Sequence, residues 1–193
     1  MDKPHILSLP KIGSTVIVRY LQEEDLSEMY RMESDPDVKR YLDGPIHHPH
    51  EEWIRGVASK LSRCRDFAIL AKDTGQFAGR AALDIFRSSE EVREIQVVIS
   101  KDYWGRHFGR EVSNILIAAA FDELGAEQVI GIVHPRNEFC LKLLHIFGFE
   151  QMGVIPKPSS WQQGYLRFVL SRAVYKKWPQ ELRCATCQPI ETD

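Results

Sequence analysis

The sequence has 193 residues, of which 44% are hydrophobic and 27% charged, a balance that fits one globular domain with its own core and excludes a disordered chain. The formal net charge of -2 gives no general attraction to nucleic acid or to an anionic membrane, so neither is expected as a partner. The chain has no run of about 18 apolar residues and no apolar signal sequence after Met1, and we therefore predict a cytoplasmic protein.

The first half of the chain predicts helices followed by an antiparallel meander. Residues 1–13 are expected to form an N-terminal arm, and residues 15–21 are rich in β-branched and aromatic side chains, which predicts a strand. Helices are expected after Asp25, after Asp35-Pro36 and around Trp53, where caps or apolar side chains at helical spacing occur. Three predicted strands follow, at residues 67–71, 77–86 and 92–99.

The second half of the chain predicts a crossover from strand to helix to strand. The clearest helix pattern runs from Gly109 to Leu124, and a further helix is expected from the cap Asn137 through Phe147. The remaining strands are expected at residues 128–133, 149–155 and 165–171, before a tail at 177–193. The order predicts one α/β domain at residues 14–176, with a mixed, mostly antiparallel sheet of about six or seven strands and about four helices.

The stretch EIQVVISKDYWGRHFG, from Glu94 to Gly109, combines the end of a strand, a loop with two glycines and the start of the long helix. Three cations, Lys101, Arg106 and Arg110, lie in or beside this loop. The unpaired N–H groups and the dipole of a helix N-terminus favour an anion. Spacing alone leaves two interpretations open, a phosphate or pyrophosphate site and an ordinary loop.

This stretch resembles the GNAT superfamily of acyl-CoA N-acyltransferases, especially the ribosomal-protein N-terminal acetyltransferases, in which the segment often reads EIGYWIxPxYWGKGYATEA. The matching residues here are Glu94, Ile95, Ile99, Tyr103, Trp104, Gly105 and Glu111. A second family block, N-x-x-S-x-x-L-x-x-x-x-GF, is matched by Asn137, Leu143, Gly148 and Phe149, with Cys140 in place of Ser. The blocks occur in the family's order, and the resemblance covers about residues 14–172.

The resemblance implies a sheet that splays near the cofactor site and acetyl-CoA as a co-substrate, without a metal. Val98 and Ile99 would hydrogen-bond the pantetheine arm, and Asn137 would line the cofactor channel. The pyrophosphate would be held by the loop and the helix start, at Trp104, Gly105, Arg106, His107, Phe108, Gly109 and Arg110. His107 stands where the family has its middle loop glycine, and a positive φ there would suit His less well than Gly.

Acetyl transfer to an amine requires a base for the ammonium proton and stabilisation of the thioester oxygen. Glu94 is the candidate base, because its side chain shares one strand face with Gln96 and Val98 on the way to the loop. The alternative is an ordinary ion pair of Glu94 with Arg93 or another surface cation. By resemblance, a backbone N–H near Val98 or Ile99 would stabilise the oxygen.

His145 is the candidate acid for the departing thiolate. It lies three residues before Gly148, where the resemblance implies Tyr or Glu, and an imidazole titrates near neutrality. Two alternatives stay open. His145 could be a helix residue bonded to a backbone carbonyl, or no acid could be needed because a thiolate is already a fair leaving group.

Two polar clusters are candidate ligand sites. The first is a group of three histidines in a turn: His47, His48 and His50. Pro49 and the turn disfavour a fixed metal geometry, and the resemblance implies instead that this loop lines the acceptor pocket. The opposite wall would come from Trp161, Gln162 and Gln163. Cys184 and Cys187 form a CxxC without a second ligand pair nearby, so no metal is expected there.

The sequence therefore favours an acetyl-CoA-dependent N-acetyltransferase that works by direct attack in a ternary complex. The favoured acceptor, by resemblance, is the N-terminal α-amine of a protein or peptide. A small amine, such as a polyamine or an aminoglycoside-like compound, is an alternative, and so is a non-catalytic acyl-CoA-binding sensor. A monomer and a homodimer are both open.

Overall fold

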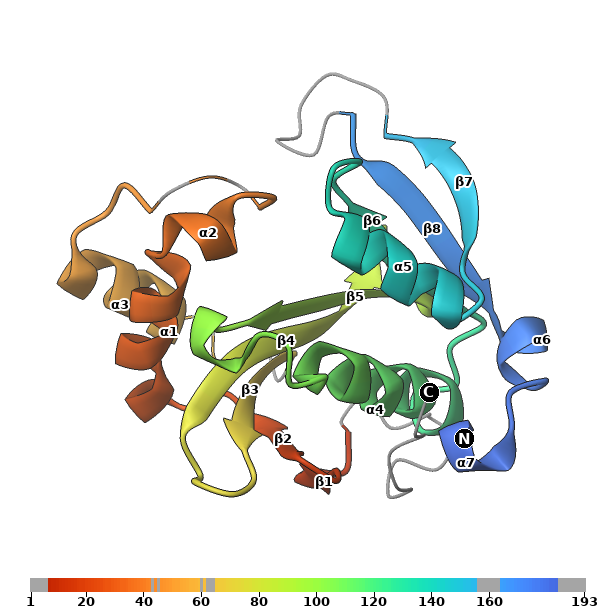
Figure 1. The fold of residues 1–193 in the computed structure, drawn as a ribbon, viewed down its shortest axis with the longest axis horizontal. Coiled ribbons are helices and arrows are strands. Elements are labelled where there is room, and N and C mark those ends of the chain that lie inside the picture. The colour runs from red at the N-terminus through yellow and green to blue at the C-terminus, as the bar shows by residue number, and fades with distance from the viewer. Residues whose placement is uncertain are drawn as a thin grey trace.

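A computed structural model describes residues 7–42, 44, 46–59, 61, 65–155 and 164–183 of the chain. Within these residues, eight strands form one sheet in the order β1-β2-β3-β4-β5-β6-β8-β7 (Figure 1). The predicted α/β class with a mixed, mostly antiparallel sheet is confirmed. The sheet has more strands than the six or seven expected, because two residues of the expected N-terminal arm pair with its edge.

The strands are β1 (Lys11–Ile12), β2 (Val16–Tyr20), β3 (Asp66–Ala71), β4 (Phe77–Phe86), β5 (Ser89–Ile99), β6 (Gln128–Val133), β7 (Glu150–Val154) and β8 (Leu166–Ser171). The α-helices are α1 (Leu26–Glu33), α2 (Pro36–Lys39), α3 (His50–Ala58), α4 (Phe108–Asp122), α5 (Glu138–Ile146), α6 (Arg172–Tyr175) and α7 (Gln180–Arg183). The short 3-10 helix η1 (Glu23–Asp25) precedes α1, and a second one, η3 (Lys101–Tyr103), lies in the loop between β5 and α4.

Side-chain caps fix the starts of two helices as the sequence predicts. The Asp35 carboxylate accepts a bond from the Asp37 N–H (2.8 Å) at α2, and the Asn137 amide oxygen accepts one from the Cys140 N–H (3.2 Å) at α5. Asp25 precedes α1 as expected, but its carboxylate does not cap the helix, because it binds the Arg19 guanidinium instead.

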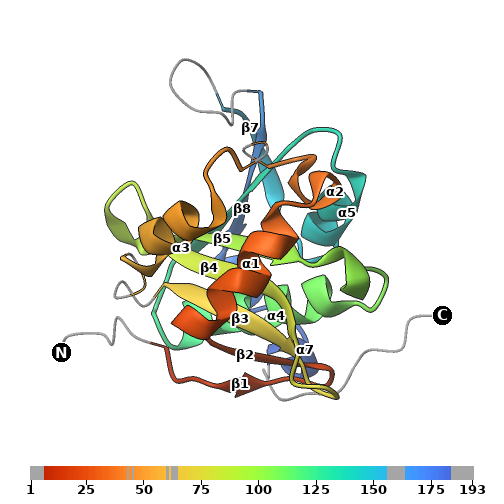
Figure 2. The same ribbon diagram turned by 90° about the vertical axis from the view of Figure 1, so that its left-hand side faces the viewer.

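The helices cover both faces of the sheet (Figures 1 and 2). The α4 face carries the larger core, in which α4 packs on β2, β3 and β4 together with Ile95, Val97 and Ile99 of β5. On the opposite face, α1 and α3 pack over Ala68 and Val98. Because successive strand side chains alternate between faces, the even-numbered residues of β5 from Glu94 to Val98 face α1, away from α4.

The described part of the N-terminal arm is fastened along α4. Leu7 is buried in the larger core. The Glu111 carboxylate accepts bonds from the N–H groups of Ser14 and Thr15, and Lys11 pairs with Glu123 near the other end of the helix. Glu111 matches the family block, and in this structure it holds the arm in place.

The sheet is joined across its middle by a short parallel ladder. β5 and β6 pair only through Val92–Glu94 with Gln128–Ile130, whereas β6 and β8 pair along six residues each. Beyond Glu94 the two strands have no further pairing, so the sheet opens between Ile95–Ile99 and Gly131–Val133. This is the predicted splay, and it confirms that part of the expected fold.

Candidate active site

The loop between β5 and α4 is held in place by its own side chains. The Trp104 indole N–H donates to the Ile99 carbonyl (2.9 Å), and the Tyr103 ring stacks on Phe108. Gly105 has φ +77° and His107 has φ +62°, so both lie in the left-handed region. The position where the family has its middle glycine therefore does require a positive φ here, and His107 adopts it.

The start of α4 has free backbone donors. No side chain caps this helix, in contrast to α2 and α5. Arg106 lies over the Tyr103 ring (5.4 Å to the centroid), and no acidic side chain in the described part of the chain pairs with Arg106 or Arg110. An uncapped helix start beside two unpaired guanidinium groups fits the diphosphate of CoA.

The strand register shows which backbone groups of β5 face the opening. The Ser100 N–H donates to the Ala78 carbonyl of β4 (2.8 Å), and Val98 of β5 pairs with Arg80 of β4. Even-numbered residues of this stretch therefore turn their N–H and C=O groups toward β4, and Val97 and Ile99 turn theirs toward the opening. Of the two predicted residues, Ile99 therefore turns its backbone groups toward the opening and Val98 turns its own toward β4, while Val97 also faces the opening. The orientation of these backbone groups follows from the register of β5 with β4, which the sequence alone does not give.

Glu94 lies at the last rung of the parallel ladder, opposite Ile130, on the α1 face of the sheet. Its carboxylate meets the Gln96 amide at 3.5 Å and, within the described residues, forms no ion pair. Burial raises the pKa of Glu94, the Gln96 contact opposes the shift, and the charge of Asp84 adds to it. The expected alternative, a pairing of Glu94 with Arg93, does not occur, since adjacent strand residues face opposite ways.

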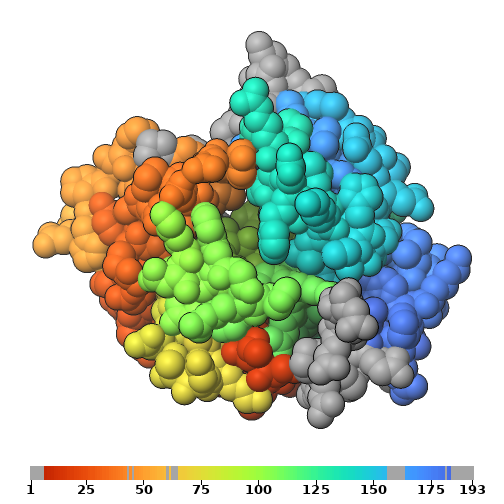
Figure 3. All heavy atoms as spheres, viewed as in Figure 1, coloured from red at the N-terminus to blue at the C-terminus, as the bar shows by residue number. Residues whose placement is uncertain are grey.

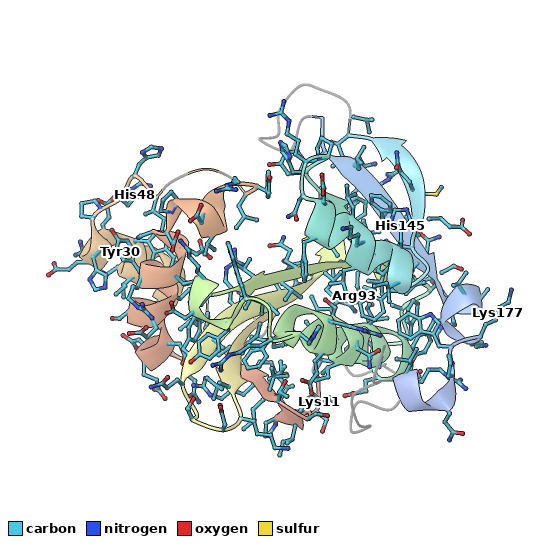
Figure 4. The ribbon with its side chains drawn as sticks, viewed as in Figure 1. Lys11, Tyr30, His48, Arg93, His145 and Lys177 are labelled. Carbon is cyan, nitrogen blue, oxygen red and sulfur yellow. The ribbon has the colours of Figure 1, made fainter. Side chains whose placement is uncertain are left out.

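His145 lies on the other face of the sheet. Its Nδ1 is 2.6 Å from the Leu141 carbonyl of α5, and its ring meets the edge of Phe168 on β8 (Figure 4). Phe168 pairs with Gly131, whereas Glu94 pairs with the preceding residue, Ile130. The structure therefore does not bring His145 together with Glu94, and its carbonyl contact is the alternative that the sequence left open.

Two asparagines lie on the helices that follow β5 and β6, Asn114 within α4 and Asn137 at the start of α5. The Asn137 amide oxygen is used as the cap of α5, which leaves its N–H₂ group as a donor. The Asn114 amide oxygen is buried on α4 without a hydrogen-bond partner, one turn after Arg110. The sequence offered no signal for Asn114 beyond a polar residue in an apolar helix.

His48 lies beside Tyr30 of α1 at the outer edge of the molecule (Figure 4), and His50 is the first residue of α3. His48 is 3.4 Å from Glu52, and the His50 ring meets Tyr30 at 4.8 Å. No group of three or more potential metal-binding side chains occurs in the part of the chain that the structure describes. The predicted acceptor wall at Trp161, Gln162 and Gln163 and the CxxC at Cys184 and Cys187 lie outside the described residues.

These features surround one hollow. Figure 3 shows it between α1 and α2, the loop before α4, and the end of β6 with α5, with β5 at its floor. The splayed strand and the loop before α4 thus border the same hollow.

Comparison with known proteins identifies the family. The chain matches the acetyltransferase (GNAT) domain over residues 15–150 and therefore belongs to the GNAT acetyltransferases, which take their acetyl group from acetyl-CoA. It is similar to p20 of Bacillus licheniformis, an uncharacterized N-acetyltransferase, with 23% identity over 149 residues, which are 72% of this chain and 80% of that protein. The resemblance to the superfamily is confirmed.

Solved structures share the fold. A spermidine N-acetyltransferase from Vibrio cholerae, in complex with CoA and spermine, has a TM-score of 0.73 and 18% identity and covers 85% of this chain and 99% of its own. A ribosomal-protein-S5-alanine acetyltransferase from Vibrio fischeri has a TM-score of 0.68 and 16% identity and covers 85% and 97%. No helix among the described residues is long and apolar enough to cross a membrane.

Proposed function

We propose that the protein transfers the acetyl group of acetyl-CoA to a primary amine by direct attack in a ternary complex, with Glu94 as the base. The observation that carries this proposal is the state of Glu94. It is a partly buried carboxylate without an ion-pair partner among the described residues, at the point where the sheet opens. A carboxylate with a raised pKa is suited to accept a proton near neutral pH.

The cofactor is held, in this proposal, by the chain's own backbone and cations. Acetyl-CoA supplies the acetyl group as a thioester. The N–H groups at the start of α4, with Arg106 and Arg110, bind its diphosphate. The backbone groups of Val97 and Ile99 line the opening and orient the pantetheine arm, and one of their N–H groups stabilises the thioester oxygen as its charge develops.

Glu94 acts from the other face of the sheet. The acceptor enters on the α1 face as an ammonium ion, and the Glu94 carboxylate takes its proton directly or through water, which makes the nitrogen a nucleophile. Asp84 lies next to Glu94 and adds negative charge that attracts the ammonium ion. In this proposal the thiolate departs without help from a general acid. For His145 to protonate it, the imidazole ring would first have to give up its contact with the Leu141 carbonyl.

The favoured acceptor is the N-terminal α-amine of a protein or peptide, with a small polyamine-like amine as the second candidate. Relatives of the same fold carry both kinds of name, a ribosomal-protein-alanine acetyltransferase and a spermidine acetyltransferase. The pair of carboxylates at Glu94 and Asp84 suits either ammonium ion, and it gives particular support to an acceptor that carries more than one positive charge.

The test is a mass-spectrometric screen of peptides and amines for acetyl-CoA-dependent gain of an acetyl group, run with wild type, Glu94→Gln and Glu91→Gln. Glu91 is an exposed carboxylate on the same strand, so its variant is the matched control. Glu94→Gln should lower kcat/KM about 100-fold or more and leave CoA binding by calorimetry unchanged. Full activity of Glu94→Gln removes Glu94 from the mechanism, and a wild type that binds acetyl-CoA but acetylates nothing indicates an acyl-CoA-binding module.

A further inference from the structure

A histidine that the proposed mechanism does not use lies directly after β6. Val133, the last residue of β6, packs in the core on the α4 side, so the next side chain, His134, turns to the α1 side. A ring contact supports this direction, because His134 stacks on Tyr41, which follows α2 (5.1 Å between centroids, 28° between planes). The neighbouring Val38 of α2 belongs to the core on the α1 side. His134 thus lies on the face from which the acceptor would approach Glu94.

The imidazole ring of His134 is held in one orientation. Its Nδ1 accepts a hydrogen bond from the Arg136 N–H (3.1 Å). The Tyr165 ring meets the imidazole edge-on at 5.0 Å, and the Tyr165 hydroxyl donates toward the backbone carbonyls of Tyr41 (3.3 Å) and Leu42 (3.4 Å). Because the ring contacts fix the plane of the imidazole and the Arg136 bond fixes its rotation, the ring has little freedom to turn.

The bond from Arg136 also decides which nitrogen of His134 carries the proton. A neutral imidazole has one donor nitrogen and one acceptor nitrogen. Since Nδ1 accepts the Arg136 N–H, the proton of the neutral ring lies on Nε2. Within the described residues Nε2 has no hydrogen-bond partner, and it is not among the enclosed unpaired atoms. It is therefore an oriented N–H donor that is open to a ligand.

The spacing along β6 relates this donor to the proposed base. Glu94 pairs with Ile130, and His134 lies four residues beyond Ile130 on the same face. At about 3.3 Å per strand residue, the backbone of His134 is roughly 13 Å from that rung. The two side chains shorten this span from both ends, and an extended peptide advances about 3.3–3.6 Å per residue. A peptide whose α-amine meets Glu94 therefore brings a carbonyl of its first three residues to Nε2.

We propose that His134 recognises the acceptor: its Nε2–H donates to a backbone carbonyl of a peptide whose α-amine lies at Glu94, and so favours a peptide N-terminus over a simple amine. This inference rests on the proposed amine acetylation and names its acceptor class. The donor is oriented before the substrate arrives, which lowers the ordering cost of the bond. A simple alkylamine offers the same ammonium group to Glu94 but has no carbonyl for His134. The proposed cofactor contacts lie on β5 and at the start of α4, so acetyl-CoA affinity should not depend on His134.

The experiment measures kcat/KM with a tripeptide that has a free α-amine and with an unbranched alkylamine, and it measures acetyl-CoA affinity by calorimetry. His134→Phe keeps a ring for the contacts with Tyr41 and Tyr165 and removes the donor. His134→Gln loses the ring but returns an N–H donor on a side chain of similar reach. Tyr41→Phe is the matched control, because it keeps the stack and deletes the hydroxyl of the neighbouring ring, the rival donor.

His134→Phe should lower the kcat/KM for the peptide about fivefold, the effect of one lost neutral hydrogen bond. The kcat/KM for the alkylamine and the acetyl-CoA Kd should stay within about twofold of wild type. His134→Gln should recover part of the loss, and Tyr41→Phe should match wild type with the peptide. The peptide measurements decide the inference even if the wild type does not use the alkylamine.

An unchanged peptide kcat/KM in a folded His134→Phe enzyme overturns the inference alone. An equal loss with the alkylamine overturns it too, since His134 would then act on the thioester or on the fold. An equal loss in Tyr41→Phe makes the phenol the donor and overturns it as well. A wild type that acetylates the alkylamine but no peptide overturns the inference and leaves the acetyl transfer standing, whereas a wild type that acetylates no amine overturns the proposed function also.

Discussion

Asp84 of β4 lies directly opposite Glu94 of β5, so two carboxylates face each other across neighbouring antiparallel strands. Like charges in this position destabilise a sheet, and in the part of the chain that the structure describes Asp84 has one loose ion-pair partner, Arg65, at 3.9 Å. The arrangement keeps negative charge beside the proposed base, which is useful at a site that must attract an ammonium ion and then take its proton.

The first prediction concerns the pH dependence of catalysis. The pKa of Glu94 is raised mainly by burial and additionally by Asp84, and a base must be ionised to act, so kcat/KM should fall as pH drops through that raised pKa. Asp84→Asn removes the repulsion and should shift this acidic limb to lower pH. The shift should stay below about one pH unit, because solvent screens an exposed charge. A pH–rate profile checks this, with Asp73→Asn in the β3–β4 turn as a control that should not move the limb.

The same shift affects folding. A carboxyl group whose pKa is higher in the folded state than in the unfolded state stabilises the fold most at low pH, and that contribution is lost as pH rises through the folded-state pKa. Wild type should therefore lose more unfolding free energy than Glu94→Gln between mildly acidic and mildly alkaline pH. Parallel urea titrations of the two proteins would contradict the placement of Glu94 in a buried environment.

The second prediction concerns the loop before α4. His107 is held at φ +62°, which suits glycine better, and the proposal uses only its backbone N–H. His107→Gly should therefore keep the acetyl-CoA Kd within about twofold and leave the thermal midpoint unchanged or slightly raised. Arg106→Glu, which places a negative charge beside the phosphates, should raise the acetyl-CoA KM about tenfold or more. A large loss of affinity in His107→Gly would mean that the imidazole itself contacts the cofactor.

The third prediction concerns a buried carboxylate that the mechanism does not use. Glu33 of α1 is 5% exposed and binds Arg80 of β4 and, at 3.4 Å, Lys39 of α2. Glu33→Gln would leave two enclosed cations without their shared partner and should lower the free energy of unfolding by about 3–5 kcal/mol. Urea unfolding measures it. Glu28→Gln, which breaks an exposed pair with Arg31, should cost less than about 0.5 kcal/mol.

The fourth prediction concerns His145. Because its ring is bonded to the Leu141 carbonyl and faces Phe168, His145→Phe should keep kcat within about twofold and leave the alkaline side of the pH–rate profile in place. A drop of 100-fold with unchanged CoA affinity would restore His145 as the acid and would require its ring to turn toward the opening during turnover.

Much of the fold could be predicted because its signals are local. The helix pattern that gave Gly109–Leu124 corresponds to α4 at Phe108–Asp122, and the strand predicted at 128–133 is β6 with the same bounds. The cap at Asn137 is confirmed by its bond to Cys140. The edge strand β1 was missed, because two residues carry no pattern and become a strand only by pairing with Val18 and Ile17.

The site was less predictable wherever it depends on pairing between distant segments. Glu94 could be found from its strand and the family block, but whether Val97 or Val98 turns its backbone to the opening depends on the register with β4. The ring contacts of His134 with Tyr41 and Tyr165 left no trace in the sequence, since these residues belong to segments that meet only in the folded protein. The same holds for the orientation of His145, which is set by its contact with Phe168.

The three-rung ladder between β5 and β6 also has a mechanical meaning. Backbone pairing joins the β1–β5 part of the sheet to the β6–β8 part through three residue pairs. A compound that reaches from the start of α4 into the gap would contact both parts and hold them together. A thioester analogue should accordingly raise the melting temperature by mass action, and by more than a fragment that carries the nucleotide alone. A melting assay with acyl chains of graded length would then rank how much of the gap each one spans.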